Sequence, residues 1–342
     1  MMMSETKTNA TSRPGLRGWL KGEAAQTNVM LAVSCVLVLI AMTALRPSMF
    51  LSSYNFESMA FFMPELGILS IAMMIAMLTG GIDLSIVGVA NLAGITAGTL
   101  FGAMAGDGGS GALGLGPVTL GVSAALIVGL LAGLLNGFLI SVLKITPILA
   151  TLGTGQVFIG MCLVLTGGPA IVGFPPGWNA IGNGKLVGIP VPLVIFVLVC
   201  IALSLLLART SFGLRLKLIG TNPKAAVYAG VKRGQMILYS YMLTGMLAAM
   251  AGILLSARTN AAKSDYGASY LLQAVLIAVL GGTNPAGGRG NVLGVALALI
   301  SLTLLSSGFQ MMRVSNHLID FVWGAFLIGV IALNSWRRRK GA

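Results

Sequence analysis

Long apolar runs separated by short polar segments make up most of this chain. A helix needs about 20 mostly apolar residues to cross the roughly 30 Å hydrocarbon core of a bilayer. Ten runs come near this length, and none contains Lys or Arg. We therefore predict an all-α, polytopic membrane protein with ten spans, the eighth being short, as in a tilted, broken or re-entrant helix. The predicted spans are 28–45, 59–79, 86–105, 118–142, 147–166, 190–208, 236–256, 268–282, 291–309 and 318–335.

The cations of the connecting segments predict an orientation. If both termini lie in the cytoplasm, 16 of the 21 Lys and Arg residues fall in inner segments, which is the positive-inside pattern. The C-terminal "WRRRK" is its strongest anchor. The remaining five fall in outer segments: Arg46, Lys185, Arg258, Lys263 and Arg313.

The same pattern divides the chain into three parts. Residues 1–27 form a basic cytoplasmic tail, and we read the first span as uncleaved because no A-x-A cleavage signal follows it. Residues 28–335 form the transmembrane domain, which contains a long cytoplasmic loop, 209–235. Residues 336–342 form a basic C-terminal tail.

Composition supports a membrane protein and excludes several other classes. The chain has 342 residues, of which 56% are hydrophobic and only 8% are charged, against roughly 25% charged in soluble domains. The net charge of +13 is clustered in loops, which favours contact with anionic lipid over nucleic acid. Cys35, Cys162 and Cys200 lie in apolar runs without disulfide or metal-site spacing, so we expect no metal site.

Motifs for catalysis are absent from the sequence. No P-loop, H-E-x-x-H motif or Ser/His/Asp set occurs, so we expect neither a catalytic site nor a bound cofactor. If ATP drives this protein, a separate polypeptide must bind and hydrolyse it. Glu65 alone among the acids is placed to act as an intramembrane relay, and one acid without a buried cationic partner is weak support for an ion-coupled carrier.

The other polar groups within the spans are neutral. Each of these amides either bonds one helix to another or lines a wet path, and the sequence leaves both readings open. As a set, they suit a neutral polyhydroxy solute better than an ion. The candidate translocation path comprises Glu65, Asn91, Asn136, Gln156 and Gln273, and Gln310 is a further buried amide.

The long cytoplasmic loop contains a short predicted helix. In "GTNPKAAVYAGV" (220–231), Asn222 is a suitable N-cap, Pro223 takes the first helical position and Gly230 ends the helix. Two helical turns are unstable alone in water, so this helix needs a packing partner.

The composition of this helix suggests what the partner is. Ala225, Ala226 and Ala229 form a predicted small-residue face that another protein could approach closely. Lys224, with Lys232 and Arg233 beyond the helix, could pair with acids of that protein. The spacing is equally compatible with a helix lying on anionic lipid.

Paired glycines interrupt the chain at two places. "LTGGIDLSIVGVANLAG" (78–94) ends the second span, and "LGGTNPAGGRGNVLG" (280–294) ends the eighth. Matching breaks in two halves suggest an internal five-plus-five repeat, although paired glycines are also ordinary turn residues. The candidate hinge residues are Gly80, Gly81, Asp83, Ser85, Gly281 and Gly282, where Asp83 or Ser85 could cap the next helix.

These motifs together resemble a known family. "GTNPKAAVYAGV", "LTGGIDLS", "TPILATLGTGQVFIG" (146–160), "LTGG" (165–168) and "VLGGTNPAGGRGNVLG" (279–294) occur in the order found in permease subunits of bacterial ABC importers for monosaccharides. Those importers are of the ribose, xylose, arabinose, rhamnose and autoinducer-2 type. The resemblance covers residues 30 to 335, and "SSGF" (306–309) departs from the family's "NNGL".

The resemblance implies partners and a mechanism. It implies two permeases docked on a dimer of ATP-binding subunits, supplied by a periplasmic sugar-binding protein in the bacterial inner membrane. It also implies that 220–231 is the coupling helix, seated in a groove of the ATPase. Gly220, Asn222, Ala225, Ala226 and Gly230 match the family pattern, whereas Thr221 and Lys224 lie at variable positions. No sugar-contacting residue is carried over.

We thus expect a permease that moves a monosaccharide or similar solute by alternating access. ATP binding to the partner would move the coupling helix, and the spans would rock about the glycine breaks. The alternatives are a permease of the same wider group for nucleosides or branched-chain amino acids, and an ion-coupled secondary sugar carrier that depends on Glu65.

Overall fold

The computed structural model describes residues 23–105 and 113–340, and nearly all of them are helical. Residues 1–22, most of the predicted N-terminal tail, lie outside this range, as do residues 341–342 of the C-terminal tail. The helices are α2 (Glu23–Leu45), α3 (Pro47–Phe50), α4 (Ser53–Leu78), α5 (Ile86–Ala105), α6 (Leu115–Ser141), α7 (Pro147–Thr166), α8 (Pro176–Asn183), α9 (Val191–Arg209), α10 (Ser211–Thr221), α11 (Pro223–Tyr228), α12 (Arg233–Thr259), α13 (Tyr270–Leu280), α14 (Val292–Met311) and α15 (Asn316–Lys340).

Eight helices of the described part are long and apolar enough to cross a membrane. They coincide with eight of the predicted spans. The predicted eighth span is the 11-residue helix α13, as short as expected, and the tenth falls in α15. The all-α, multi-pass fold is confirmed, while the count of ten spans, the placement of the termini and the internal repeat stay predictions.

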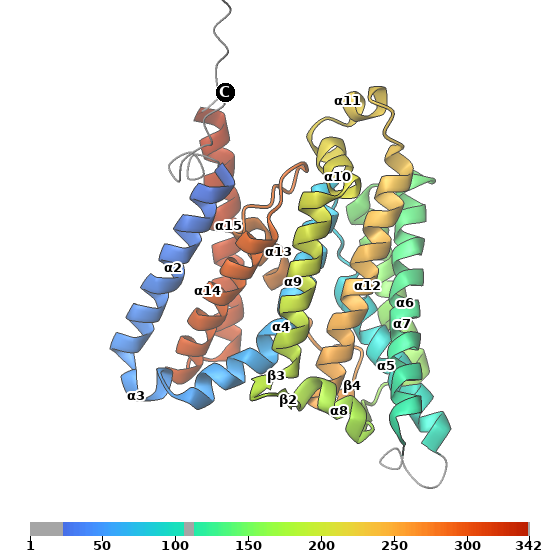
Figure 1. Cartoon of the computed structure of the whole chain (residues 1–342), viewed down its shortest axis with the longest axis vertical. Coiled ribbons are helices and arrows are strands. Elements are labelled where there is room, and N and C mark those ends of the chain that lie inside the picture. Colours follow the sequence, from blue (N-terminus) through green and yellow to red (C-terminus); the bar gives the residue numbers. More distant parts are fainter. Residues whose placement is uncertain (1–22, 106–112, 341–342) are drawn as a thin grey trace, which may run out of the picture.

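The helices run between two ends of the molecule (Figure 1). One end carries α10, α11 and the C-terminal end of α15, and the other carries α3, α8 and the short strands. We call these the α11 end and the α8 end. The strands form two small antiparallel pairs, β1 (Ile171–Val172) with β4 (Ala261–Ala262) and β2 (Lys185–Leu186) with β3 (Ile189–Pro190). The segments assigned to the cytoplasm from their charges lie at the α11 end.

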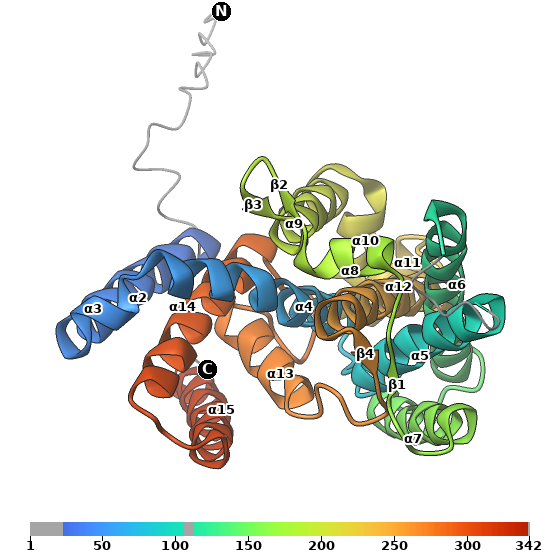
Figure 2. The ribbon, with the colours of Figure 1, turned by 90° about the horizontal axis from the view of Figure 1, so that it is seen from below.

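Helix α4 forms the centre of the core. Every residue from Ile68 to Leu78 is buried, and α12, α13, α14 and α9 pack around it. Viewed along the bundle, α2, α3, α14 and α15 lie to one side of α4, and α5, α6, α7 and α12 lie to the other (Figure 2). Pro64 within α4 removes one backbone hydrogen bond, which allows the helix to bend before it enters the core.

Small residues bring α6 and α12 close together. Gly129 and Gly133 of α6 face Gly245 of α12, and a Cβ on any of the three would overlap backbone atoms of the opposite helix. Three glycines at four-residue spacing, the third being Gly137, form the small-residue seam that membrane helices use for close backbone approach.

Candidate functional site

Helix α11 forms as the sequence predicts at its two ends. The Asn222 side chain accepts a hydrogen bond from the Ala225 N–H at 3.0 Å, and Pro223 takes the first helical position. Gly230 then adopts a left-handed φ of +79°, a conformation open to glycine at no steric cost. The result is a six-residue helix that projects from the α11 end (Figure 1).

The predicted small-residue face of α11 is wrong in one respect. Ala225 and Ala229 are exposed, but Ala226 is only 3% exposed and packs into the core of its own chain. The reason is that a two-turn helix rests one side on the protein, and Ala226 lies on that side. The free surface carries Lys224 and Tyr228 instead, the latter 92% exposed.

Backbone contacts connect the helix that precedes α11 to the rest of the bundle. The Gly288 N–H donates to the Leu78 carbonyl at 3.0 Å, which joins the 281–291 loop to the end of α4. Gly220, near the end of α10, touches both, and a Cβ there would overlap the Leu78 carbonyl and the Gly288 backbone. Gly287 likewise abuts the Gly220 backbone. We call Leu78, Gly220, Gly287 and Gly288 the glycine clasp.

The two predicted hinges end their helices in the same way. Gly80 donates to Met77 at 2.9 Å and Gly282 to Val279 at 3.1 Å, both with φ above +80°. The next N–H in each case reaches back five residues, which completes a Schellman motif. The glycine equivalent to Gly80 in this cap is therefore Gly282, one place after Gly281.

Beyond the first hinge, Asp83 is buried in a network of neutral partners. One carboxylate oxygen accepts from the Ser85 N–H at 3.0 Å and the Ser85 hydroxyl at 2.6 Å. The other accepts from Thr244 of α12 at 3.0 Å. Asn136 of α6 donates to Ser85 at 2.7 Å and accepts from Thr154 of α7 at 2.6 Å. Asn136 thus joins α6 to α7 and to the turn that precedes α5, so its amide is already hydrogen-bonded on both sides.

Glu65 has a cationic partner that the sequence did not reveal, and this partner is itself partly buried. Arg258, assigned to an outer loop, lies in the last turn of α12, and its Nη2 donates to Glu65 Oε1 at 2.8 Å. Its Nε donates to Oε2 at 3.3 Å, and the Tyr270 hydroxyl donates to Oε1 at 2.7 Å. Glu65 itself is 1% exposed. The carboxylate therefore ties α4, α12 and α13 together.

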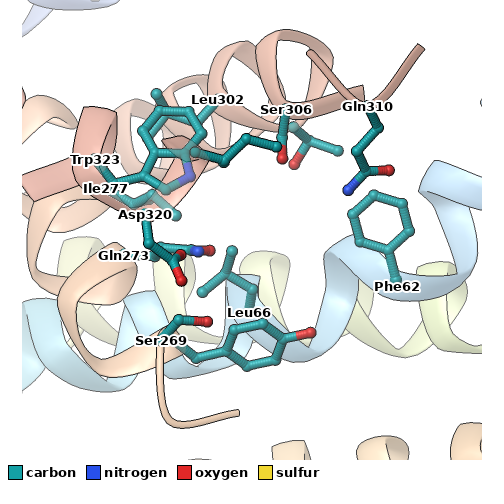
Figure 3. Close-up of a pocket in the computed structure, with 13 residues that line it drawn as sticks. Phe62, Leu66, Ser269, Gln273, Ile277, Leu302, Ser306, Gln310, Asp320 and Trp323 are labelled. Atoms are coloured by element: carbon teal, nitrogen blue, oxygen red, sulfur yellow. The ribbon is translucent and has the colours of Figure 1, made fainter. Parts of the chain in front are cut away.

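Next to this ion pair lies a cavity of about 400 Å³ between α4, α13, α14 and α15. Gln273 of the candidate path lines it, together with Gln310, Ser306 and Asp320. In Figure 3, Gln273, Asp320 and Trp323 gather on one side of the space, and Ser306, Gln310 and Phe62 on the other. We call this the α13–α15 cavity.

A second cavity, of about 580 Å³, lies between α5, α7 and the 262–270 loop. Both Asn91 and Gln156 line it. Asn91 uses its amide N–H groups on the backbone carbonyls of Ser264 and Tyr266, each at 2.9 Å, and so holds the loop in place. In the same loop, the hydrogen bond and charge of Asp265 raise the pKa of Lys263 above its ordinary value.

The five candidate path residues therefore do not share one space. Asn91 and Gln156 belong to one cavity, Gln273 to another, and Asn136 and Glu65 to two separate polar clusters. Sequence reasoning missed Thr154, Thr244, Arg258, Tyr270 and Trp323. Hydroxyls and aromatics are common in apolar helices, so only the charge of Arg258 gave a signal, and its position at the end of a run suggested a loop. Within the described residues, no group of three or more His, Cys, Asp or Glu could hold a metal ion.

Comparison with known proteins places the chain in a family. Residues 55–331 match the family described as branched-chain amino acid transport system / permease component. The autoinducer 2 import system permease protein LsrD of Escherichia coli K12 is 34% identical over 308 residues, covering 88% of this chain and 89% of that protein. The protein of the same name from Yersinia enterocolitica is 36% identical over 272 residues, covering 78% and 79%. No solved structure matches.

The matched region contains every feature described above: the glycine clasp, both hinges, helix α11, the two polar clusters and the two cavities. The resemblance expected from the sequence motifs is thereby confirmed. The chain belongs to the permease family of branched-chain amino acid transport systems, and it is a multi-pass inner-membrane permease component of an ABC import system.

Proposed function

We propose that the chain imports a neutral, monosaccharide-like solute of the autoinducer-2 type and that separate ATPase subunits drive the transport. The substrate proposal rests on the autoinducer 2 permeases, which align with 88% of the chain. The chemistry of the α13–α15 cavity agrees with it, because the side chains that line this cavity are mainly amides, hydroxyls and aromatics. Such groups recognise hydroxyl-rich molecules without requiring a charge on the solute.

The arrangement of Glu65 argues against ion coupling. A relay carboxylate must gain and release a proton or cation, whereas Glu65 is held by a two-point contact from Arg258 and a third bond from Tyr270. Such charge-assisted bonds resist exchange. Asp83 is similarly saturated by Ser85 and Thr244. The driving force therefore comes from a partner that binds and hydrolyses ATP with Mg²⁺, and this chain binds neither.

The observation that carries the partner proposal is the exposed surface of α11. Lys224, Ala225, Tyr228 and Ala229 are exposed together on a helix too short to be stable without support. Exposed Tyr is a frequent anchor of protein interfaces, and Ala on either side permits a groove to close around it. Lipid contact remains the competing reading of the same basic surface, and the test below separates the two.

Force applied to α11 has a direct route into the bundle. Helix α10 ends at the glycine clasp, where Gly220 touches both the end of α4 and the 281–291 loop. Both glycine hinges lie within a few residues of this contact. We infer that displacement of α11 moves α4 against α5 and α13 against α14, with Gly80–Gly81 and Gly281–Gly282 as the flexing points. The solute path then opens alternately to each side.

The proposal includes three partners. A dimer of ATP-binding subunits occupies the α11 end, and a periplasmic solute-binding protein delivers the cargo at the α8 end. A second permease chain, identical or paralogous, completes the translocation path. A permease for nucleosides or branched-chain amino acids would share all three, and the family description favours branched-chain amino acids as the competing cargo.

The partner proposal is tested by charge reversal and truncation on α11. The Lys224→Glu and Tyr228→Ala variants should insert into the membrane normally but lose co-purification with the ATPase and solute-stimulated ATP hydrolysis. The matched control is Arg313→Glu, an exposed position beyond α14. Retention of the ATPase by both α11 variants would assign this surface to lipid.

The substrate is tested in proteoliposomes that contain the permeases, the ATPase and the binding protein. We expect ATP-dependent uptake of autoinducer 2 or of a pentose such as ribose, and no uptake of leucine or uridine. Uptake that persists without ATP but collapses with an uncoupler would favour the ion-coupled carrier.

A further inference from the structure

We propose that the α13–α15 cavity is a binding site for a neutral, ring-sized polyhydroxy solute on its way through the membrane. This inference rests on the proposed function and assigns it a place in the fold. The cavity's volume of about 400 Å³ falls in the range of about 300–1,000 Å³ usual for small-molecule sites.

Polar groups around the α13–α15 cavity differ in their hydrogen bonding from most buried polar groups of the bundle. Many buried polar side chains elsewhere in the bundle are bonded, as Asn91, Asn136 and Thr244 are, and the unbonded ones, such as the Tyr241 and Thr283 hydroxyls, are scattered. Around this cavity the unbonded groups are concentrated. Within residues 23–105 and 113–340, no hydrogen bond or ion pair is made by the side chains of Ser269, Gln273, Thr303, Ser306, Gln310 and Asp320.

Free polar groups inside a membrane protein carry a cost unless water or a ligand satisfies them. Three of the six, Gln273, Thr303 and Ser306, are buried or half-buried. The other three are exposed at the opening of the space and add to the donors and acceptors that the fold leaves unused. Of all six, two are amides and three are hydroxyls, each able both to donate and to accept, and the sixth is a carboxylate that accepts. This is the complement of several sugar hydroxyls.

Aromatic rings line the cavity together with these polar groups. Trp323 is 3% exposed and lines the cavity together with Phe62 and Tyr270. Aromatic faces accept the apolar C–H faces of a ring-shaped solute, whereas the amides bind its rim. The remaining apolar lining is aliphatic, and Figure 3 shows Leu66 between the two polar sides.

One wall of the cavity is held in place by an ion pair. The Tyr270 hydroxyl donates to Glu65 at 2.7 Å, and Arg258 holds Glu65 from the other side. These bonds fix the direction of the Tyr270 ring. Glu65 and Arg258 are therefore positioning residues for this wall. The ion pair thus has a structural role that does not involve ion transport.

The cavity opens toward the α8 end of the molecule. Its exposed residues, Ser269, Gln310 and Asp320, lie just before α13, at the end of α14 and near the start of α15. All three positions are on the α8 side, where the proposed binding protein releases its cargo. The buried members, Thr303 and Trp323, lie deeper. The described conformation thus offers the site to the outer face.

The test uses a cysteine placed in the cavity. In a background in which Cys35, Cys162 and Cys200 are replaced by Ser, Ser306→Cys is exposed to a membrane-impermeant thiol reagent from the outer side. We expect modification that slows in the presence of whichever of autoinducer 2, ribose, leucine and uridine the same proteoliposomes take up. Glycine betaine at equal osmolarity should give no protection.

A pair of amide variants tests the same site by transport. Gln273→Leu should raise the apparent KM by about five- to tenfold, as expected for one lost hydrogen bond. Gln26→Leu, which removes an exposed amide of α2 that lines neither cavity, should leave KM unchanged. Equal effects of the two substitutions would overturn the proposal.

The outcomes separate this inference from the function on which it rests. Uptake of a sugar without protection of Ser306→Cys overturns the site and leaves the proposed function intact. Uptake of leucine instead of any sugar overturns both. A cysteine that reacts in detergent but not in lipid membranes would show a lipid in the cavity, and this also overturns the site.

Discussion

The Arg258 guanidinium contacts both carboxylate oxygens of Glu65 across 193 residues of sequence. Glu65 lies in the middle of a buried helix and Arg258 in the last turn of another, so neither position alone reveals the pair. Because of this contact, Glu65, the one carboxylate placed to act as a relay, has a structural role instead. It also brings Tyr270 to the wall of the α13–α15 cavity.

Replacing one residue of this pair should lower the free energy of unfolding by more than replacing both. Arg258→Met leaves Glu65 as an uncompensated buried charge, for which the expected loss is about 3–5 kcal/mol of unfolding free energy. The double variant with Glu65→Gln should recover most of that loss. Unfolding in detergent, followed by circular dichroism, measures both.

The control for this cycle is Arg313→Met, which removes an exposed cation and should shift stability by less than about 0.5 kcal/mol. If the two single changes add in the double variant, Glu65 and Arg258 do not interact as described.

A single methyl group at the glycine clasp should uncouple the transporter. Gly220→Ala favours the α10 helix by about 1 kcal/mol through propensity alone. The added Cβ nevertheless overlaps the Leu78 carbonyl and the Gly288 backbone, for which overpacking typically costs about 1–3 kcal/mol. We expect solute-stimulated ATP hydrolysis and uptake to fall while the ATPase still co-purifies.

Gly153→Ala provides the comparison, because a Cβ at this α7 position meets open space. Normal uptake by Gly220→Ala would mean that the clasp separates easily and transmits no force.

The Asp83 network should behave as one unit. Asn136→Leu removes the donor to Ser85 and the acceptor of Thr154. Each group left unsatisfied costs about 1–3 kcal/mol. The double variant Asn136→Leu/Thr154→Val should lose less unfolding free energy than the sum of the losses of the two single variants. The reason is that Thr154→Val removes the hydroxyl whose acceptor Asn136→Leu has already removed.

Thermal unfolding of the two single variants and the double variant gives the coupling between these positions. Gln156→Leu serves as the reference for replacing an intramembrane amide, since Gln156 is exposed and lines a cavity. Additive losses at Asn136 and Thr154 would contradict the network.

Local sequence predicted the local structure well. Apolar runs predicted eight of the long helices, and the short run at 268–282 predicted the short helix α13. The Asn222 cap, the Pro223 start and the Gly230 end of α11 followed from residue type alone. In each case the signal lies within a few residues, because helix ends are stabilised by neighbours in the chain.

The candidate site was predicted less completely. The five path residues were chosen because each is polar within an apolar run, and this criterion cannot tell which of them meet. It grouped Asn136 with Gln273. Asn136 is hydrogen-bonded to Ser85 and Thr154, whereas Gln273 lines a cavity and makes no side-chain hydrogen bond within the described residues. It also placed Ala226 on a free face that the fold buries.

The sequence by itself determined the class, the helices, the caps and, through colinear motifs, the family. Those properties depend on hydropathy and on contacts between near neighbours. Tertiary structure alone decided that Arg258 neutralises Glu65 and that Gly220 meets Gly288. It also placed around one cavity six polar side chains that make no hydrogen bond to another residue of the described ranges. Such contacts join residues far apart in the chain, and only the packing of the helices determines which of their faces meet.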